Sequence, residues 1–414
     1  MQRSKLSNGI VMESTHKPKP HYLPLDSIRG IAALSVAIHH VILMKIFLAA
    51  FSNKAWFDCA FFHNAWLFVD LFFVLSGIVI SMSYTDADFG KFSFRDFMVR
   101  RLARIYPLHI VMLVALLVFR LARIGLVTVG LLTVTPWQFE VNTAYTFVLN
   151  VFLLHSLGFV DYLSWNGPSW SISVEFYTYI VFGLLLLFAQ RLNSRTVLYA
   201  TAAIMVVGNW IIIVFVLQKE ALGLQYDFGM LRCLLSFFLG VLVVRFVGPL
   251  SKIKSPIYQF GLQVGSLVAS FGLVVLVSNY PAASFAAPFV FALLLASLMA
   301  FPKAPLLPRL LESKPLVWLG ARSYSIYMVH AFVILLAEYA VRVVGPRPIE
   351  ALDSIRPGLA STLTYGVIIA AVIVLSDFTY RLVEIPGGKF VRRLLQREPS
   401  FSTAQSVQTS RRLS

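Results

Sequence analysis

The stretch Leu25–Phe47, LDSIRGIAALSVAIHHVILMKIF, decides how the rest of the chain is interpreted. It is apolar and long enough to cross a bilayer, for which about 20 residues suffice. It nevertheless contains Arg29 near its start and His39 and His40 further along. Arg29 and His40 fall on one face of the predicted helix, about 16 Å apart along its axis, so we expect a guanidinium near one membrane surface and an imidazole near the middle. Ionisable groups at membrane depth are costly and therefore indicate function.

The composition is typical of a polytopic membrane protein. Of the 414 residues, 58% are hydrophobic and only 13% are charged, whereas soluble domains have about 25% charged residues. The net charge of +16 does not indicate a nucleic-acid partner, because the basic residues are spread between apolar runs rather than gathered in one patch. Positive charge in cytoplasmic loops explains it better. Cys59 and Cys233 are too few for a disulfide framework and lack metal-ligand spacing.

The apolar runs predict an all-α bundle of about ten transmembrane helices. These spans fall near residues 28–48, 66–84, 107–133, 170–190, 196–217, 229–247, 257–279, 283–301, 316–344 and 358–379. Basic segments occupy alternate connections, at Lys91–Arg104, Arg191–Arg195, Arg245–Lys254, Lys303–Lys314 and Arg381–Arg397. This alternation predicts that both chain termini are cytoplasmic. We therefore expect a cytoplasmic tail over 1–24, a transmembrane domain over 25–395 and a disordered tail over 396–414.

Two places interrupt this regular pattern. The segment Ala144–Val160 is apolar, but if it crossed the bilayer every later basic loop would lie outside, so we expect a re-entrant or interfacial segment there. Pro107 is expected to begin the third span, a position where its missing N–H costs nothing. Five motifs with polar or charged residues occur at the span ends: LFVDLFFVLSG (Leu67–Gly77), RRLARIYP (Arg100–Pro107), PSWSISVE (Pro168–Glu175), SYSIYMVH (Ser323–His330) and LVEIP (Leu382–Pro386).

Several side chains in these motifs are candidates for a site. A neutral imidazole at His40 can take a proton from a hydroxyl, and a carboxylate at Glu175 or Asp70 would set its tautomer. Structural alternatives stay open: Asp70 pairing with an Arg or His, Glu175 pairing with Arg29 or Arg232, and Ser76 bonding to a backbone carbonyl. Trp170 is either an interface-belt residue or a stacking surface for a sugar ring. The remaining candidates for binding are Arg100, Arg101, Arg104, Tyr324 and His330.

Taken in order, these motifs resemble those of the acyltransferase-3 family of integral-membrane O-acyltransferases, whose first helix carries an Arg, ten residues and then a His. The resemblance covers about Tyr22–Leu395. It implies transfer of an acyl group, commonly acetyl, from cytoplasmic acyl-coenzyme A to a hydroxyl of a surface glycan or glycoconjugate. It also implies catalytic roles for Arg29, His40 and Glu175 and donor contacts for the Arg100–Arg104 cluster. Two departures stand out: Phe176 and Tyr177 replace an expected second acidic residue and a Gln, and Gly387-Gly388 replaces a basic residue.

Other functions remain compatible with the residues. A transporter or flippase would also use intramembrane Arg, His and Asp, although no internal symmetry is evident. A non-catalytic scaffold or sensor would tolerate loss of His40 or Glu175. Within the enzyme class, the acceptor could equally be a small molecule such as a macrolide. We expect no metal and no permanently bound cofactor, acyl-coenzyme A being a co-substrate, and a location in the bacterial inner membrane. The final basic segment is expected to anchor the chain rather than to take part in chemistry.

Overall fold

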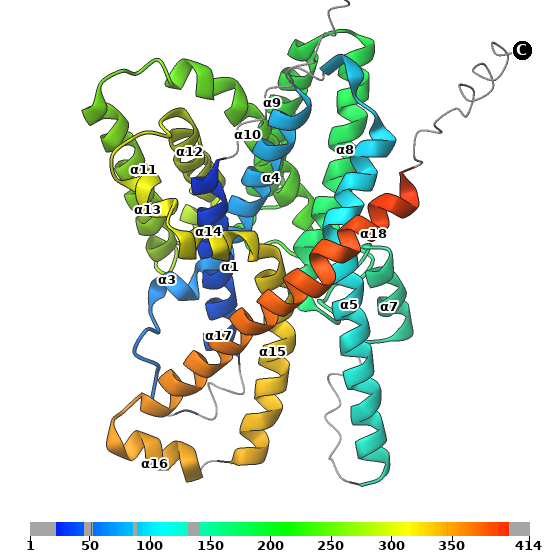
Figure 1. Cartoon of the computed structure of the whole chain (residues 1–414), viewed down its shortest axis with the longest axis vertical. Coiled ribbons are helices and arrows are strands. Elements are labelled where there is room, and N and C mark those ends of the chain that lie inside the picture. Colours follow the sequence, from blue (N-terminus) through cyan, green and yellow to red (C-terminus); the bar gives the residue numbers. More distant parts are fainter. Residues whose placement is uncertain are drawn as a thin grey trace, which may run out of the picture.

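The computed structural model describes residues 22–44, 51, 53–85, 89–130, 141–345 and 347–396, and every regular element among them is helical. Ten helices in these ranges are long and apolar enough to cross a membrane. They form a bundle in which α1 is central and α17 with α18 runs obliquely across the others (Figure 1). The predicted all-α bundle of ten spans is therefore confirmed. The tails over 1–21 and 397–414 lie outside the described residues, as do Pro136, Gln138 and Glu140.

The helices follow the predicted spans closely, with short extra elements between them. In chain order they are α1 (Leu23–Ile42), α3 (Ala60–His63), α4 (Phe68–Tyr84), α5 (Phe94–Thr128), α7 (Ala144–Val151), α8 (Trp170–Arg191), α9 (Arg195–Ile211), α10 (Gly229–Leu250), α11 (Pro256–Leu276), α12 (Ala287–Ala300), α13 (Leu307–Leu311), α14 (Lys314–Ala321), α15 (Ser323–Val344), α16 (Arg347–Ile355), α17 (Leu359–Thr379) and α18 (Ile385–Leu395). A π-helical turn, η6 (Tyr380–Glu384), joins α17 to α18 without a break.

Glycines bring the central helices into close contact. A Cβ on Gly77 of α4 would lie 2.0 Å from the Phe237 carbonyl oxygen, and one on Gly240 of α10 would lie 2.0 Å from the Val74 carbonyl oxygen. A Cβ on Gly320 would likewise lie 2.2 Å from the Asp26 carbonyl oxygen, so α14 crosses α1 at the turn that contains Arg29. Small residues allow this backbone approach in membrane helices.

Helix α5 corrects the expectation about Pro107. The helix begins after Ser93, whose hydroxyl accepts from the Asp96 N–H at 3.3 Å, so Pro107 lies inside it rather than at its start. Its 35 residues span about 52 Å at 1.5 Å per residue. Because Pro has no N–H, the carbonyl of Ala103 has no partner four residues on. The basic cluster Arg100–Arg104 is therefore helical and belongs to the same rigid element as the span that follows.

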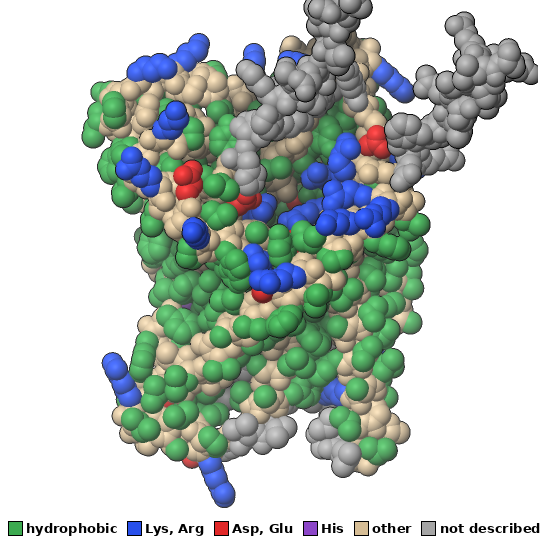
Figure 2. Space-filling view, in the orientation of Figure 1, with side chains coloured by type: hydrophobic (Ala, Val, Ile, Leu, Met, Phe, Trp, Pro, Cys, Tyr) green, Lys and Arg blue, Asp and Glu red, His purple; other side chains and the backbone are tan. Residues whose placement is uncertain are grey.

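One end of the bundle carries most of the positive charge. At this end α1 begins, α4 ends, α5 begins and α18 ends, and we call it the basic end. In Figure 2, Lys and Arg side chains gather around α18 and this end, and a broad band of hydrophobic side chains lies beyond them. Helix α7 lies beside α5 at Tyr106 and His109, which bond to the carbonyls of Val151 and Asn150. It has only eight residues, about 12 Å at 1.5 Å per residue, which is too short to cross a bilayer.

Candidate active site

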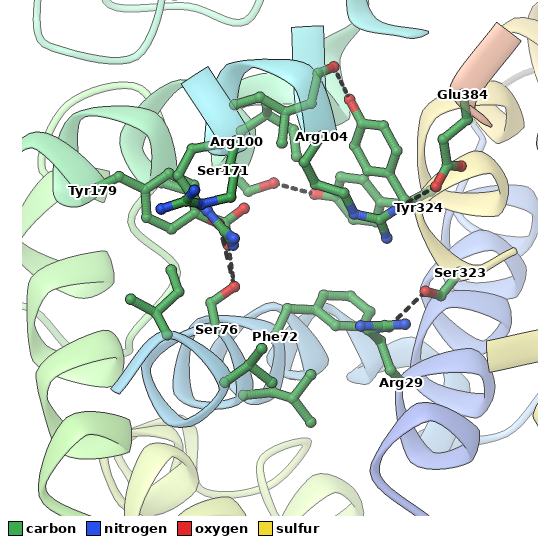
Figure 3. A pocket seen from close by; sticks show the side chains of 18 of the residues that line it. Arg29, Phe72, Ser76, Arg100, Arg104, Ser171, Tyr179, Ser323, Tyr324 and Glu384 are labelled. Atoms are coloured by element: carbon green, nitrogen blue, oxygen red, sulfur yellow. Dashed lines mark hydrogen bonds and ion pairs between the residues drawn. The ribbon is translucent and has the colours of Figure 1, made fainter. Parts of the chain in front are cut away.

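A cavity of about 410 Å³ opens among α1, α4, α5, α8, α15 and α18, next to the basic end (Figure 3). Its charged lining consists of five arginines and two carboxylates: Arg29, Arg100, Arg101, Arg104, Arg392, Glu175 and Glu384. With every group ionised, this is an excess of three positive charges. Such a lining favours an anionic ligand, and the planar guanidinium groups suit phosphate in particular.

Arg29 is held rigidly at one wall of the cavity. Its Nε donates to Ser323 Oγ at 2.8 Å, and one Nη donates to Asp26 Oδ1 at 2.9 Å and to the Gly320 carbonyl at 3.3 Å. Ser323 begins α15, directly after the helix that crosses α1 at Gly320. The short connection between α14 and α15 therefore sets the position of the guanidinium.

The three arginines of α5 that line the cavity have different partners. Arg104 forms an ion pair with Glu384 of η6, and Ser325 Oγ donates to the other oxygen of that carboxylate at 2.7 Å. Arg100 Nε donates to the Tyr84 hydroxyl at 2.8 Å, and Arg101 lies over the Tyr179 ring at 5.8 Å. Among the described residues, Arg100 and Arg101 thus have aromatic neighbours but no carboxylate partner, and their charge is available to a ligand.

Glu175 sits deeper in the cavity. Its Oε1 accepts hydrogen bonds from Ser76 Oγ and from the Tyr179 hydroxyl, the latter at 2.6 Å. Ser76, Glu175 and Tyr179 all line the cavity, from α4 and α8. Glu175 is therefore engaged by hydroxyl groups, and among the described residues it forms no hydrogen bond or ion pair with His40, Arg29 or Arg232.

A pair of imidazoles lies beyond the inner end of the cavity. The rings of His40 and His330 have centroids 4.9 Å apart. His40 Nδ1 lies 2.9 Å from the Val36 carbonyl oxygen, and His330 Nδ1 lies 3.2 Å from the Ile326 carbonyl oxygen. Because a carbonyl can only accept, each Nδ1 carries the proton and each Nε2 keeps a free lone pair. The Nε2 of His330 is buried without a partner among the described residues.

Two aromatic rings separate the cavity from this pair. Phe72 and Tyr327 line the cavity and contact each other edge to face at 5.8 Å. The Tyr327 ring also contacts His330 at 5.7 Å. The Tyr327 hydroxyl accepts from Ser171 Oγ and donates to the Pro168 carbonyl, both at 2.8 Å, which fixes the ring. The basic cavity and the imidazoles are consequently neighbours across a single layer of side chains.

Comparison with known proteins decides the family. A family model described as an acyltransferase domain, acyltransferase-3, matches residues 23–381. The chain belongs to the acyltransferase-3 family. The matched region begins with α1 and extends into η6, so it contains every helix that contributes to the cavity except α18.

Several curated bacterial proteins are similar to this acyltransferase-3 chain. A Staphylococcus aureus protein provisionally named as an O-acetyltransferase is 24% identical, over 94% of this chain and 61% of its own length. The O-acetyltransferase OatA of the same species is 23% identical, over 89% of this chain and 58% of its own. YrhL of Bacillus subtilis, provisionally named as a peptidoglycan O-acetyltransferase, is 26% identical, over 80% and 52% respectively. The chain thus spans about half to three fifths of these relatives. No solved structure matches it.

Within this acyltransferase-3 fold, two predicted binding residues are buried in structural contacts instead. Asp70 is fully buried and accepts from Arg232 Nη2 at 2.7 Å and from Ser236 Oγ at 2.9 Å. Trp170 is 4% exposed and lies 5.4 Å from the same guanidinium, so it is neither a belt residue nor an open stacking surface. Of the alternatives open for Asp70, the pairing with an arginine is the one observed. Neither residue lines the cavity.

The expected partner of His40 also differs from the one observed. The sequence predicted that Glu175 or Asp70 would set its tautomer, but Val36 does so through its backbone carbonyl, one helical turn earlier. This local bond needs no second helix, and the sequence does not single it out because any helical histidine can make it. The sequence predicted His40 near the middle of the membrane span. It lies instead in the last turn of α1, toward the end opposite Arg29.

Other residues of the cavity were not predicted as site residues. Glu384 and Arg392 line it from the final segment, for which only anchoring was expected, and Tyr179 lines it from α8. The LVEIP motif is the sequence signal that points to Glu384. Tyr324, which was predicted, lines the cavity and donates to the Ile105 carbonyl at 2.5 Å. Among the described residues, no group of three His, Cys, Asp or Glu side chains is placed to hold a metal ion.

Proposed function

We propose that the protein is a membrane O-acyltransferase that moves an acyl group, preferably acetyl, from cytoplasmic acyl-coenzyme A to a hydroxyl of a cell-surface glycan. The observation that carries the proposal is the adjacency of a cavity rich in arginine to two imidazoles with free Nε2 lone pairs. The family membership supports the reaction type, and the names of the relatives support a cell-wall glycan as acceptor.

In this mechanism the cavity binds the donor from the basic end. The positive-inside rule assigns that end to the cytoplasm, where acyl-coenzyme A is made. Arg29 and the Arg100–Arg104 cluster attract the anionic donor, and its uncharged pantetheine arm with the thioester extends toward Phe72 and Tyr327. The paired state of Arg29 and Arg104 keeps both guanidinium groups in position before the donor arrives. Pre-organised groups lose little entropy on binding.

His40 then acts as the general base. Its Nε2 takes the proton of the acceptor hydroxyl while the hydroxyl oxygen attacks the thioester carbonyl carbon, and the C–S bond breaks. The thiolate of coenzyme A leaves and receives the proton from the His40 imidazolium, so the products are an ester and a free thiol. His330 presents a second free Nε2 beside His40. It accepts a hydrogen bond from the acceptor and so orients the acceptor. The Phe72–Tyr327 layer must part for the thioester to reach the imidazoles.

The test uses the purified chain in nanodiscs with radiolabelled acetyl-coenzyme A and two acceptors, peptidoglycan fragments and a glycan extract of the host. We expect labelled glycan from the wild type and a loss of kcat of about 10²–10⁴ in His40→Ala, the usual contribution of a general base. His39→Ala is the matched control. His39 is adjacent in sequence but hydrogen-bonds to the Phe62 carbonyl at 3.0 Å, so transfer should persist.

The outcomes separate the alternatives. If thioester loss depends on His40 but no glycan is labelled, acyl-coenzyme A stays the proposed donor, and a small hydroxyl compound becomes the proposed acceptor. Equal activity of His40→Ala and His39→Ala would exclude His40 as the base. If the wild type neither consumes nor binds acetyl or longer acyl donors, the enzyme proposal fails and transport assays in vesicles become the next experiment.

A further inference from the structure

The final helix, α18, forms a wall of the arginine-lined cavity. Glu384, Ile385, Gly388 and Arg392 line it. Their spacing of one, four and eight positions places them along one stripe of the helical segment. One face of the chain's last described helix is thus directed at the cavity, although the sequence alone indicated only an anchor there.

The position of α18 depends on its two consecutive glycines. A Cβ on Gly387 would lie 2.6 Å from Cβ of Pro107, and one on Gly388 would lie 2.8 Å from the Ala103 carbonyl oxygen. That carbonyl is the one that Pro107 leaves without its helical partner. A side chain on either glycine would therefore force the two helices apart. The Gly387-Gly388 departure from the family pattern is the condition for this contact.

The contacts also fix the depth of Arg392 in the cavity. The helices run antiparallel, since Gly387 meets Pro107, Gly388 meets Ala103, and Arg95 donates to the Leu395 carbonyl at 2.7 Å. Arg392, which lies between the second and third of these contacts, is consequently level with Arg100, at the open end of the cavity. Figure 2 shows the resulting concentration of Lys and Arg around α18.

The guanidinium of Arg392 is oriented but not neutralised. Its Nε donates to the Gly388 carbonyl at 3.2 Å, and its Nη2 lies 4.0 Å from the point that a Cβ on Gly388 would occupy. Within the described part of the chain it has no carboxylate partner. Arg100 and Arg101 share this property, whereas Arg29 and Arg104 are paired with Asp26 and Glu384. The excess positive charge of the cavity is therefore located at its mouth, on two helices.

We propose that Arg392 binds a phosphate group of the nucleotide end of the donor at this mouth, together with Arg100, and so determines affinity for the donor. The inference rests on the proposed function. An acyl-coenzyme A that enters with its thioester first leaves its diphosphate and 3′-phosphate at the mouth, where guanidinium groups can each pair with two phosphate oxygens. Gly387-Gly388 stands where the family has a basic residue, and Arg392, one turn later, supplies the positive charge instead.

The test compares Arg392→Ala with Arg393→Ala, its neighbour on α18 that does not line the cavity. Equilibrium binding and steady-state kinetics are measured in nanodiscs with acetyl-coenzyme A. Loss of one charge-assisted contact should raise Kd and KM about tenfold, with kcat unchanged at saturation, while Arg393→Ala behaves as wild type. Arg392→Lys should recover part of the affinity because it keeps the charge without the planar fork. Gly388→Ala should weaken binding through the displaced helix.

Acetyl-dephospho-coenzyme A identifies the phosphate. If the difference between wild type and Arg392→Ala disappears with this donor, the contact is to the 3′-phosphate, and if it persists, the contact is to the diphosphate. Equal affinities of Arg392→Ala and Arg393→Ala for acetyl-coenzyme A would overturn the inference while leaving the enzyme proposal intact. Absence of binding and turnover in the wild type would overturn the proposed function, and this inference with it.

Discussion

Charged side chains in and beside the membrane spans serve two purposes that local structure distinguishes. Arg232 and Asp70 are 1% and 0% exposed and neutralise each other in a bidentate contact. Arg100, Arg101 and Arg392 line a cavity without a carboxylate partner in the described residues. From sequence, both groups are ionisable residues in or beside apolar spans and indicate function equally. Only the fold distinguishes them, because the partner of Asp70 is 162 positions away.

The Asp70–Arg232 pair should therefore be needed for folding. We expect Asp70→Asn to destabilise the protein by about 3–5 kcal/mol, because it leaves a guanidinium buried and uncompensated. The measurement is thermal unfolding in detergent, followed by tryptophan fluorescence. Arg381→Ala is the control: Arg381 pairs with Asp377 at 2.9 Å but is 63% exposed, and removal of such a pair costs at most about 1 kcal/mol. Equal losses in the two variants would contradict the structural role of Asp70.

At the scale of helices, glycines rather than large apolar residues determine which faces meet. Gly77 was predictable as a contact residue because it follows a serine within an apolar span, a pattern of small residues that permits close approach. Its partner was not predictable, since the sequence offers many glycines in apolar runs, including Gly240, Gly265 and Gly272. Only the first of these three meets another helix closely.

This difference gives a matched pair of substitutions. Gly240→Ala places a methyl group 2.0 Å from the Val74 carbonyl oxygen of α4. Backbone cannot yield easily, so α4 and α10 must separate, and we expect both lower stability and weaker donor binding, because α4 carries Ser76. Gly272→Ala adds the same methyl group where no atom lies within 4 Å, and it should be neutral or stabilising by up to about 1 kcal/mol through helix propensity. Similar unfolding temperatures for the two variants would refute this account.

The segment between α7 and α8 carries a pH-dependent contribution to stability. His155 donates from Nε2 to Ser169 Oγ at 3.1 Å, since that hydroxyl itself donates to the Asn166 carbonyl, and its ring stacks on His109 at 5.9 Å. Burial, and then repulsion from His109, lower the pKa of His155 to about 3. In the unfolded chain the pKa of a histidine is about 6.5. Between these two pKa values the unfolded chain binds a proton at His155 and the folded chain does not.

The sign of this effect follows from linkage. The folded pKa lies below the unfolded one, so the contribution is complete above pH 6.5 and declines as the pH falls toward 3. At pH 5 the loss should be about 2 kcal/mol. His155→Gln retains an N–H donor but does not titrate, so it should lose less stability than wild type between pH 7.5 and pH 5. Unfolding measured at both values tests this, and equal losses would contradict it.

For the whole molecule, hydrophobic length predicted ten spans correctly, because each helix must cover about the same apolar thickness. The same criterion did not predict the charged parts of α5 and α18, which lie outside the apolar runs but are helical. Charged turns at Arg95–Arg104 and Arg381–Arg393 interrupt an apolar run without interrupting a helix. These charged parts supply four of the five arginines that line the cavity. Apolar length therefore predicts the bundle, whereas only the packing of α18 on α5 reveals the full set of charged side chains around the cavity.

The orientation of the bundle can be tested with the chain's own cysteines. Cys59, between α1 and α3, is exposed, and Cys233 is fully buried. If the basic end faces the cytoplasm, a membrane-impermeant maleimide should label Cys59 in intact spheroplasts. The matched variant carries Cys59→Ser and Ser251→Cys, which moves the exposed thiol to the basic end, just after α10. It should be labelled only after the membrane is permeabilised.

The two proteins must give opposite patterns, since ten spans and the α1–α3 connection place residues 59 and 251 on opposite sides for any orientation of the bundle. Labelling of Ser251→Cys in intact spheroplasts, with protection of Cys59, would reverse the orientation. The arginine-lined mouth would then face away from the cytoplasmic pool of acyl-coenzyme A, and donor entry at Arg100 and Arg392 could not be maintained. The expected pattern instead brings the charge of the mouth and the supply of its anionic ligand to the same side of the membrane.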